Sequence, residues 1–465
     1  MSTLTFLTHS QLHETLFAFL PTKALLECRC VHSGCDDVVI HYAKAQVQDV
    51  FGQDVVMKTA AFDETAPQHP RRTVDASLVN LLVARRVNIA HLFEESVAGL
   101  RTLSTSFLKG SNLHFARSFA SLCKALTPEL LRGLLHLELM RGDVSETLPE
   151  LLATHSTQLR SLLLGGSLSI KAHHLQLVAK NCPHLDSVEI GGSVKMDDAT
   201  LMVVATNCRN LKYLRVRGTL HISDSSMKVV AANCQALQYL DVAGSLVTDT
   251  SLKVVATHCP LLTSLDVSRT RVSDESVQLV ATNCSQLRSL WVKKCERITD
   301  ESIKLVAIHC RNLRSLDVSE NFGITDASMK LIAANCIHLR LLNVHGTDGR
   351  ITDEFILLVG VNCPQLRALD VSASRGAITD ASIRFVAVHC HQLMSLDVAY
   401  TEGAITDAAM ELVAKNCKNL CFLNIQRSGG AITEKSLKVF AENFSQIRVM
   451  DDHCLKTIGF RRTGR

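Results

Sequence analysis

The sequence predicts an α/β solenoid, in which stacked repeats place one parallel sheet on a concave side and helices on a convex side. The first observation is that ten of the seventeen cysteines recur every 25 to 27 residues, at 182, 208, 234, 259, 284, 310, 336, 363, 390 and 417. Ser156 and Phe444 continue this register at its two ends. The other two observations are a strand pattern and a helix pattern inside each period.

Each repeat divides into a strand, a turn and a helix, as CRNLRSLDVSENFGITDASMKLIAAN from Cys310 illustrates. Leu316 and Val318 alternate with an exposed residue, which is the period of a short strand with one buried face. The Ile-Thr-Asp at 324–326 supplies a Thr or Asp to cap the next helix. That helix places four side chains on one face: Met329, Ile332, Ala333 and Cys336. So short a unit cannot bury both apolar faces alone, and neighbouring repeats must therefore stack.

Composition limits the classes of function. The chain has 465 residues, of which 47% are hydrophobic and 20% charged, and a formal net charge of +4. So small a charge gives no reason to expect nucleic acid or an anionic membrane as a partner, and no apolar run reaches the roughly 18 residues of a membrane span. The first residues lack the basic segment of a secretory signal, which predicts reduced thiols and a cytoplasmic or nuclear location.

The repeated cysteine is predicted to pack as a small hydrophobe at the end of the helical stripe. A zinc site needs about four ligands roughly 2.3 Å from one ion, whereas one thiol per repeat places neighbours about 4.8 Å apart. Asn or His precedes each cysteine, as at Asn335, His309 and His389, which suggests a Cys–His catalytic pair. Because Asn and His share this position without an orienting partner, a hydrogen bond at the helix end is favoured. We therefore expect no metal, no cofactor and no catalytic residue.

The residue between the two buried strand positions should face the concave surface, where solenoids commonly bind. This column is mostly acidic and small residues precede it, so we expect its carboxylates to stand in the open on a solvated face. Trp291, the one Trp of the chain, interrupts the column beside Arg269, Lys293, Lys294 and Glu320. An exposed aromatic ringed by charges is typical of a binding hot spot, although Trp291 filling a gap beside its neighbouring strand is the alternative.

A second patch is expected around Tyr213 and Tyr239. The predicted partner-binding residues on the concave face are Tyr213, Arg215, Arg217, Tyr239, Asp241, Asp266, Arg269, Trp291, Lys293, Asp317, Asn343, Asp370 and Asp397.

Residues 6–50 lie outside the repeat and are predicted to form short helices. LLECRCVHSGCDD at 25–37 suggests a zinc site, but on a helix Cys28, His32 and Cys35 fall near one face while Cys30 points elsewhere. The segment resembles an F-box, at Leu12, Leu16, Phe17, Phe19, Leu20, Pro21, Leu25, Leu26, Cys28 and Val31. It departs from that family where Thr8 and His9 replace Leu-Pro and where Cys35 replaces Trp.

The repeats resemble the cysteine-containing class of leucine-rich repeats over residues 131–450, which implies a curved horseshoe. An F-box followed by such repeats is the arrangement of F-box/leucine-rich-repeat proteins. That resemblance implies a non-catalytic substrate receptor of a Skp–cullin–F-box (SCF) ubiquitin ligase, with a client protein for degradation on the concave face. A Skp-type adaptor, attached to the cullin ligase core, would then bind Leu12, Leu16, Phe17, Leu20, Pro21, Leu25, Leu26 and Val31.

The predicted organisation is an F-box-like module at 6–50, a linker with degenerate repeats or a cap at 51–130, the repeats at 131–450 and a tail at 451–465. Three alternatives stay open. The first 50 residues can instead cap the terminal apolar edge of the solenoid. The whole chain can be a leucine-rich-repeat scaffold with no ligase role. A thiol enzyme that uses a Cys–His pair is the third alternative.

Overall fold

The computed structural model describes residues 102–104, 131–132, 134–140, 147–165, 171–190, 196–444, 447–451 and 455–458. The chain forms two compact units, which are described separately: unit 1 is Met1–Met196 with Asn207–Arg209, and unit 2 is Asp197–Thr206 with Asn210–Arg465. The predicted F-box-like module at 6–50 lies outside the described residues. In the part of the chain that is described, no helix has the length and hydropathy to cross a membrane.

Unit 1 contains strands that pair in parallel with their sequence neighbours, and helices between them. The strands are β1 (Thr102–Ser104), β2 (His136–Met140), β3 (Ser161–Gly165) and β4 (Ser187–Ile190). The helices are α8 (Thr147–His155) and α9 (Ala172–Asn181).

Unit 2 repeats one strand and one helix. Its strands are β5 (Tyr213–Arg215), β6 (Tyr239–Asp241), β7 (Ser264–Asp266), β8 (Ser289–Trp291), β9 (Ser315–Asp317), β10 (Leu341–Asn343), β11 (Ala368–Asp370), β12 (Ser395–Asp397), β13 (Phe422–Asn424), β14 (Ile447–Met450) and β15 (Leu455–Ile458). Its helices are α10 (Asp198–Asn207), α11 (Asp224–Asn233), α12 (Asp249–His258), α13 (Asp274–Asn283), α14 (Asp300–His309), α15 (Asp326–Asn335), α16 (Asp353–Asn362), α17 (Asp380–His389), α18 (Asp407–Asn416) and α19 (Glu434–Asn443).

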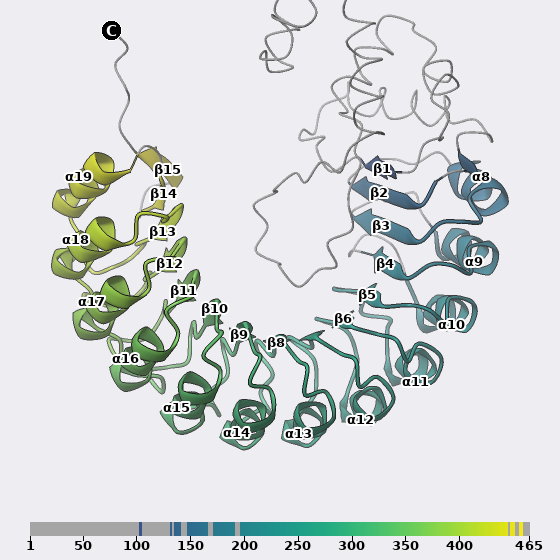
Figure 1. Ribbon diagram of the computed structural model, residues 1–465, viewed down its shortest axis with the longest axis horizontal. Coiled ribbons are helices and arrows are strands. Elements are labelled where there is room, and N and C mark those ends of the chain that lie inside the picture. Colours follow the sequence, from purple (N-terminus) through teal and green to yellow (C-terminus); the bar gives the residue numbers. More distant parts are fainter. Residues whose placement is uncertain are drawn as a thin grey trace, which may run out of the picture. The chain divides into compact units, whose positions relative to one another are not determined.

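The strands of unit 2 line the inner side of an arc and the helices form its outer side (Figure 1). From β5 to β14, each strand pairs in parallel and in register with the next, so that Leu290, Leu316 and Leu342 stand side by side. Only β15, among the described strands, runs antiparallel to its neighbour, and it closes the sheet beside β14. The predicted α/β solenoid with a parallel concave sheet and convex helices is confirmed.

The core lies between the sheet and the helices. In the repeat of β9, Leu313, Leu316 and Val318 turn inward from the strand and are fully buried. Met329 and Ile332 of α15 meet them from the helix and are also fully buried. Burial of each core Leu or Ile stabilises the fold by roughly 1.5 to 3 kcal/mol. A single repeat supplies only about half of the contacts that bury these side chains, and its neighbours supply the rest. Stacking therefore supplies most of the stability.

The repeated cysteine ends each helix and is buried, as predicted. In unit 2 its thiol donates weakly to a carbonyl of the preceding repeat, for example from Cys336 Sγ to Cys310 O at 3.6 Å and from Cys363 Sγ to Cys336 O at 3.7 Å. Burial raises the pKa of all three thiols to about 12, so the reactive thiolate is absent at neutral pH. The packing role predicted for this cysteine is confirmed.

The Asn or His before the cysteine bonds the helix end and turns away from the thiol. His258 Nδ1 lies 3.0 Å from Val254 O, His389 Nδ1 lies 2.9 Å from Phe385 O, and Asn233 Nδ2 lies 3.1 Å from Val229 O. Both histidines are exposed whereas the adjacent cysteines are buried. The helix-end hydrogen bond is confirmed, and these two residues do not form a catalytic pair with the thiol.

The Thr and the Asp of the turn have different hydrogen-bond partners: the Thr bonds within its own repeat, and the Asp bonds to the following repeat. Thr325 caps its own helix, because its Oγ1 accepts from Ala327 N at 3.1 Å. Asp326, the first residue of the helix, accepts instead from Thr352 N at 3.0 Å and from Thr352 Oγ1 at 2.5 Å in the following repeat. The same contact recurs along unit 2, at Asp198, Asp224, Asp249, Asp274, Asp300, Asp353, Asp380 and Asp407. These residues form a helix-start aspartate ladder that joins neighbouring repeats.

Candidate partner-binding surface

The inner face of the unit 2 sheet presents the first and third residue of each strand, because the middle Leu turns into the core. The third residues form the predicted column, in which Asp241, Asp266, Trp291, Asp317 and Asn343 pair in register from strand to strand. Asp370 and Asp397 continue the same column on β11 and β12. The sequence therefore placed these residues on the correct face.

The expectation that these carboxylates stand in the open is wrong. Asp241 retains 1% and Asp266 7% of its accessible surface, and Asp317, Asp370 and Asp397 are half-buried. Burial raises the pKa of Asp241 to about 6, with the nearby Asp266 charge adding to the effect. Burial, together with the Asp370 charge, likewise raises the pKa of Asp397 to about 6. This strand-end aspartate ladder is largely withdrawn from solvent.

A local hydrogen bond explains the burial. The carboxylate of each strand-end aspartate accepts the backbone N–H two residues on, from Ser268 to Asp266 at 2.9 Å and from Ser319 to Asp317 at 2.9 Å. Asn343 uses its Oδ1 in the same way for His345 N, at 2.9 Å. This Asx-type bond turns the chain off the strand and holds the side chain against the backbone.

The predicted second patch is also mostly buried. Tyr213 and Tyr239 retain 5% and 4% of their surface, and their rings stack with centroids 4.2 Å apart. Arg215 Nε pairs with Asp241 Oδ2 at 3.0 Å, and Arg217 Nη1 lies 3.9 Å from Asp266 Oδ2. The two tyrosines therefore contribute packing on this face, and Arg217 is the exposed member of the patch.

Trp291 lies on β8, half-buried, between Asp266 of β7 and Asp317 of β9. Next to it, Glu320 bridges two cations, with Lys293 Nζ at 2.9 Å and Lys294 Nζ at 3.7 Å. The hydrogen bond from Lys293 lowers the pKa of Glu320, and the charges of both lysines and of His345 act in the same direction. The accessible charged groups around Trp291 are therefore two lysines and Glu320, because the neighbouring aspartates are largely withdrawn from solvent.

The turns beside Trp291 hold charged residues in a left-handed backbone conformation. Arg269, Lys294 and Glu320 have φ of 57°, 52° and 56°, at a position of the repeat where Gly218 and Gly244 also have positive φ. A residue with a side chain costs roughly 1 to 2 kcal/mol in this conformation, which glycine avoids. Ala373, Tyr400 and Arg427 hold the position further along. Charged side chains are therefore displayed beside the tryptophan in spite of local strain.

Further along the inner face, His345 Nδ1 lies 2.7 Å from Ser372 Oγ, which donates to Asp370 Oδ1 at 2.5 Å. The serine hydroxyl faces the carboxylate and is buried, so this chain of contacts positions the side chains and does not activate a nucleophile. Within the described residues, no group of three or more His, Cys, Asp or Glu converges as a metal site would require. The predicted adaptor-binding residues, from Leu12 to Val31, lie outside the described part of the chain.

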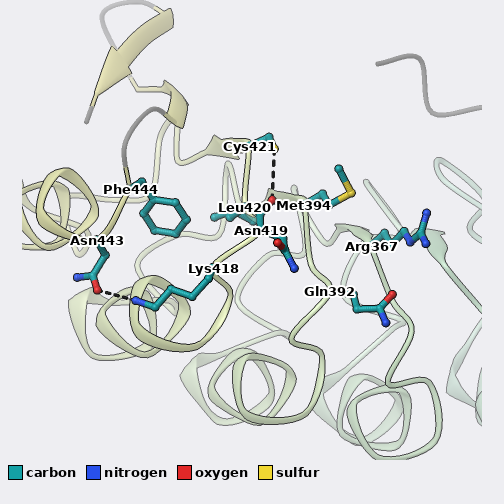
Figure 2. A pocket seen from close by; sticks show the side chains of 9 residues that line it. All are labelled: Arg367, Gln392, Met394, Lys418, Asn419, Leu420, Cys421, Asn443 and Phe444. Atoms are coloured by element: carbon teal, nitrogen blue, oxygen red, sulfur yellow. Dashed lines mark hydrogen bonds between the residues drawn. The ribbon is translucent and has the colours of Figure 1, made fainter. Parts of the chain in front are cut away.

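The structure adds a groove that the sequence did not reveal. It has a volume of about 680 Å³ and lies where the helix ends lead into β11, β12 and β13 (Figure 2). Arg367, Met394 and Cys421, the residues that precede these three strands, line it together with Lys418, Leu420 and Phe444. Among the cysteines that the structure describes, Cys421 is the exposed one.

Comparisons with known proteins found a matching family model and similar solved structures. A family model described as "Leucine Rich repeat" matches residues 258–281 and 309–333. A chain from the crystal structure of the Rad7 and Elc1 complex in yeast superposes with a TM-score of 0.56 at 18% identity, covering 78% of this chain and 90% of that one. An internalin (inlF) from Listeria monocytogenes gives a TM-score of 0.41 at 18% identity, covering 66% and 94%. No curated protein sequence matches the chain.

The sequence matches lie within unit 2, on two repeats whose helices are α13 and α15. At 18% identity, the likeness to the yeast chain shows a common fold and nothing finer. Taken with the register of strands, helices and buried cysteines, these findings show an α/β solenoid of repeats, two of which match the leucine-rich-repeat model.

Proposed function

We propose that this protein is a recognition subunit that binds a client protein on the inner face of unit 2, with Trp291 at the centre of the contact. The observation that carries the proposal is the partly exposed Trp291 beside the Lys293–Glu320–Lys294 ion pairs. Aromatic residues surrounded by charged groups commonly dominate the binding energy of an interface. Arg217, Arg269, Asn343 and the partly exposed edges of Asp317, Asp370 and Asp397 extend the surface.

We further propose that residues 6–50 act as an F-box and attach the client-binding repeats to a Skp-type adaptor and a cullin core, for ubiquitin-dependent degradation of the client. The support is the match of apolar residues from Leu12 to Val31. The structurally similar yeast chain comes from a complex of Rad7 with Elc1, which supports an assembly of repeats with a second protein. A repeat scaffold that binds a partner without a ligase remains the second candidate, favoured by the fact that the matched family model covers repeats alone.

Client binding is tested by affinity capture with the full-length protein and its Trp291→Ala variant. Truncation of a hot-spot aromatic costs about 2 kcal/mol or more, so affinity for the captured client should fall by roughly 30-fold. Phe322→Ala is the matched control, because Phe322 is an aromatic that is 57% exposed and lies in a turn. Equal capture by wild type and Trp291→Ala would remove the tryptophan from the interface.

Adaptor binding is tested with a purified Skp-type adaptor. Each apolar side chain lost from such a contact is worth roughly 1.5 to 3 kcal/mol, so the double variant Phe17→Ala, Leu20→Ala should abolish detectable binding. Leu220→Ala, which removes a 66% exposed leucine from unit 2, should bind the adaptor as wild type does. If the wild-type protein binds no adaptor, the ligase proposal is wrong and the scaffold candidate stands.

A further inference from the structure

The convex side of unit 2 carries an apolar stripe over four neighbouring helices, α14 to α17 (Figure 1). The penultimate residue of each of these helices is apolar and exposed. Leu331 is also exposed, and it lies three residues before Ala334 on the same face of α15. The larger side chains of the stripe are between 37% and 54% exposed. The apolar stripe consists of Ile308, Leu331, Ala334, Val361 and Val388.

The fold does not require an apolar residue at this position. In the two repeats before the stripe, the penultimate helix residue is Thr257 and Thr282, and in the two repeats after it Lys415 and Glu442, all exposed. Thr257 Oγ1 donates to Lys253 O at 2.9 Å within its own helix. Neighbouring repeats therefore stack with a polar residue here. Clustered exposed apolar side chains, unlike single ones, mark interaction sites.

The charged groups at the two ends of the stripe are cations. Arg384 lies one helical turn before Val388 on the same face of α17. At the other end, Arg311 Nε donates to Ile308 O at 3.3 Å, where α14 ends. Both arginines are exposed, and neither forms an ion pair with another residue that the structure describes. They are therefore open to a carboxylate of a partner.

The acidic residues of the same four helices are already engaged within the chain. Glu301 pairs with Lys304 Nζ at 2.9 Å, and Glu354 pairs with Lys330 of the preceding helix. The helix-start aspartates of these helices accept hydrogen bonds from the following repeat. The second halves of α14 to α17, where the stripe lies, contain no Asp or Glu. The stripe thus favours a partner with acidic rather than basic ends.

The spacing of the stripe matches an α-helix that lies across the four helices. Packed helices are about 8 to 10 Å apart, and seven residues of an α-helix rise about 10.5 Å. Side chains seven residues apart on a partner helix can therefore reach successive helices of unit 2. An extended strand repeats one face about every 6.8 Å, which does not match this spacing.

We propose that the apolar stripe binds an amphipathic helix of a partner protein, with apolar residues at heptad spacing and an acidic residue near each end. The apolar face of the partner helix packs on the stripe, and its acidic residues pair with Arg311 and Arg384. The helices lie on the opposite side of the sheet from Trp291. The inference therefore goes beyond the client-binding proposal and does not depend on it.

A partner helix fits the surface better than a second copy of the chain or a membrane. In a two-fold contact between two stripes, Arg311 and Arg384 of one copy would face arginines of the other, whichever way the stripes run. Surfaces that bind membranes carry many Lys and Arg beside their apolar residues. Here Lys304 and Lys330 are engaged by glutamates.

The test selects helical peptides of about 21 residues, three heptads, from a displayed library on the immobilised full-length protein. The library randomises the surface positions of one helical scaffold. Selected peptides should have apolar residues seven positions apart and Asp or Glu near both ends. Fluorescence anisotropy then measures the affinity of synthetic copies of these peptides for the protein and its variants.

The double variant Val361→Gln, Val388→Gln should bind the selected peptides at least about tenfold more weakly, because two apolar contacts are lost. Gln is a better helix former than Val, so the variant should fold. Leu261→Gln is the matched control. Leu261 is 53% exposed, as against 54% for Val361, and it lies in the turn after α12, outside the stripe.

The charges are tested with the double variant Arg311→Gln, Arg384→Gln. Its affinity for the peptides should be at least about twofold lower and should depend less on salt concentration. Arg271→Gln, Arg350→Gln is the control for charge, because it removes two exposed arginines from turns that precede helices. This control should bind the peptides as the wild-type protein does.

Circular dichroism and urea midpoints establish that each variant is folded. Selected peptides without the heptad pattern, equal loss of affinity in Leu261→Gln, or displacement of the peptides by vesicles of phosphatidylserine and phosphatidylcholine would overturn the proposal. Dimerisation in analytical ultracentrifugation that Val361→Gln, Val388→Gln abolishes would assign the stripe to a second copy instead. Trp291→Ala should bind the peptides unchanged, so failure of the inner-face proposal is distinguishable from failure of this one.

Discussion

Unit 2 contains two aspartate ladders that have the same period and different hydrogen-bond partners. The helix-start ladder accepts hydrogen bonds from the next repeat, as when Asp300 takes Thr325 N at 2.9 Å, Thr325 Oγ1 at 2.7 Å and Ser328 Oγ at 2.5 Å. Each aspartate of the strand-end ladder accepts a backbone N–H from its own repeat, as Asp317 does from Ser319, and Asp317 also accepts Asn343 Nδ2 of the next repeat at 3.1 Å. Burial opposes ionisation of both Asp300 and Asp317, but at Asp300 the hydrogen bonds outweigh it and lower the pKa, whereas at Asp317 burial prevails and raises the pKa. Position within the repeat, and not residue type, decides what a carboxylate does.

The largest effect is expected at the helix start. Asp300→Ala removes the acceptor of three hydrogen bonds and leaves the half-buried Thr325 and the buried Ser328 without it. Hydrogen bonds to charged groups contribute about 1.5 to 3 kcal/mol, and partial exposure reduces this, so unfolding should cost about 2 to 3 kcal/mol less. Urea denaturation measures the change. A midpoint equal to that of wild type would show that this ladder does not join the repeats.

The second prediction is that aspartates of the two ladders change the stability of the fold in different pH ranges. The pKa values of Asp241 and Asp397 are raised to about 6, so the folded state binds more protons than the unfolded state between about pH 4 and 6. Their contribution to stability therefore grows as the pH falls from 7 to 5. The pKa values of Asp224, Asp249 and Asp300 are lowered, because hydrogen bonds outweigh burial, and their stabilisation is lost only below about pH 4.

Carboxyl carbon chemical shifts followed by NMR check these pKa values site by site. Urea midpoints should rise between pH 7 and 5, and Asp397→Asn should flatten that rise. If Asp397 and Asp300 titrate together near pH 4, the electrostatic difference between the ladders is absent.

A smaller effect is expected for Asp317→Asn. Asn343 and Asn424 occupy the same column and accept the same backbone bond with Oδ1, at 2.9 Å and 3.2 Å. An amide can therefore replace the carboxylate in this bond and avoids the burial of a charge, although it loses the bond that Asn343 Nδ2 donates to Asp317 Oδ2 at 3.1 Å. The free energy of unfolding should fall by no more than about 1 kcal/mol. Asp300→Asn is the matched substitution at the helix start, where the amide cannot supply all the accepting positions. Equal losses for the two variants would contradict the comparison.

The smallest effect is expected at the edge of the sheet. Cys421→Ser should leave the urea midpoint unchanged, because Cys421 is exposed and donates to Asn419 O at 3.3 Å as a serine can. Burial raises the pKa of Cys390 to about 12, so iodoacetamide should modify Cys421 in the folded protein and spare Cys390. Peptide mass spectrometry reads both sites. Labelling of Cys390 before unfolding would show that this repeated cysteine is accessible to solvent in the folded protein.

The fold could be predicted from the sequence because the pattern of one short repeat occurs many times along the chain. The buried Leu316 and Val318, the cap at Thr325 and the buried Cys336 all follow from spacing within one repeat. Alternation along a strand gives the face of a residue but not its depth, which is why Asp241 and Asp266 were expected in the open. Their depth comes from a bond to the turn and from charges on neighbouring strands.

Contacts between repeats were harder to predict than contacts within them. The bond from Thr325 to Asp300 crosses 25 residues, and no local propensity signals it. A signal did exist, since Asp in the turn is followed two residues later by Ser in most repeats, as at Asp300 and Ser302. This signal becomes visible when repeats are aligned on the cysteine and compared column by column.

The bonding of the cysteine has a consequence for how such a chain can change length during evolution. Each thiol donates to a carbonyl one repeat earlier, and each helix-start aspartate accepts from one repeat later. Every such bond joins the same pair of positions in adjacent repeats, so duplication or deletion of a whole period returns each donor to an acceptor of the same kind. A deletion of a few residues within a helix or strand instead shifts all later positions out of register. Gene segments that encode whole repeats are therefore the natural unit in which this arc is lengthened or shortened.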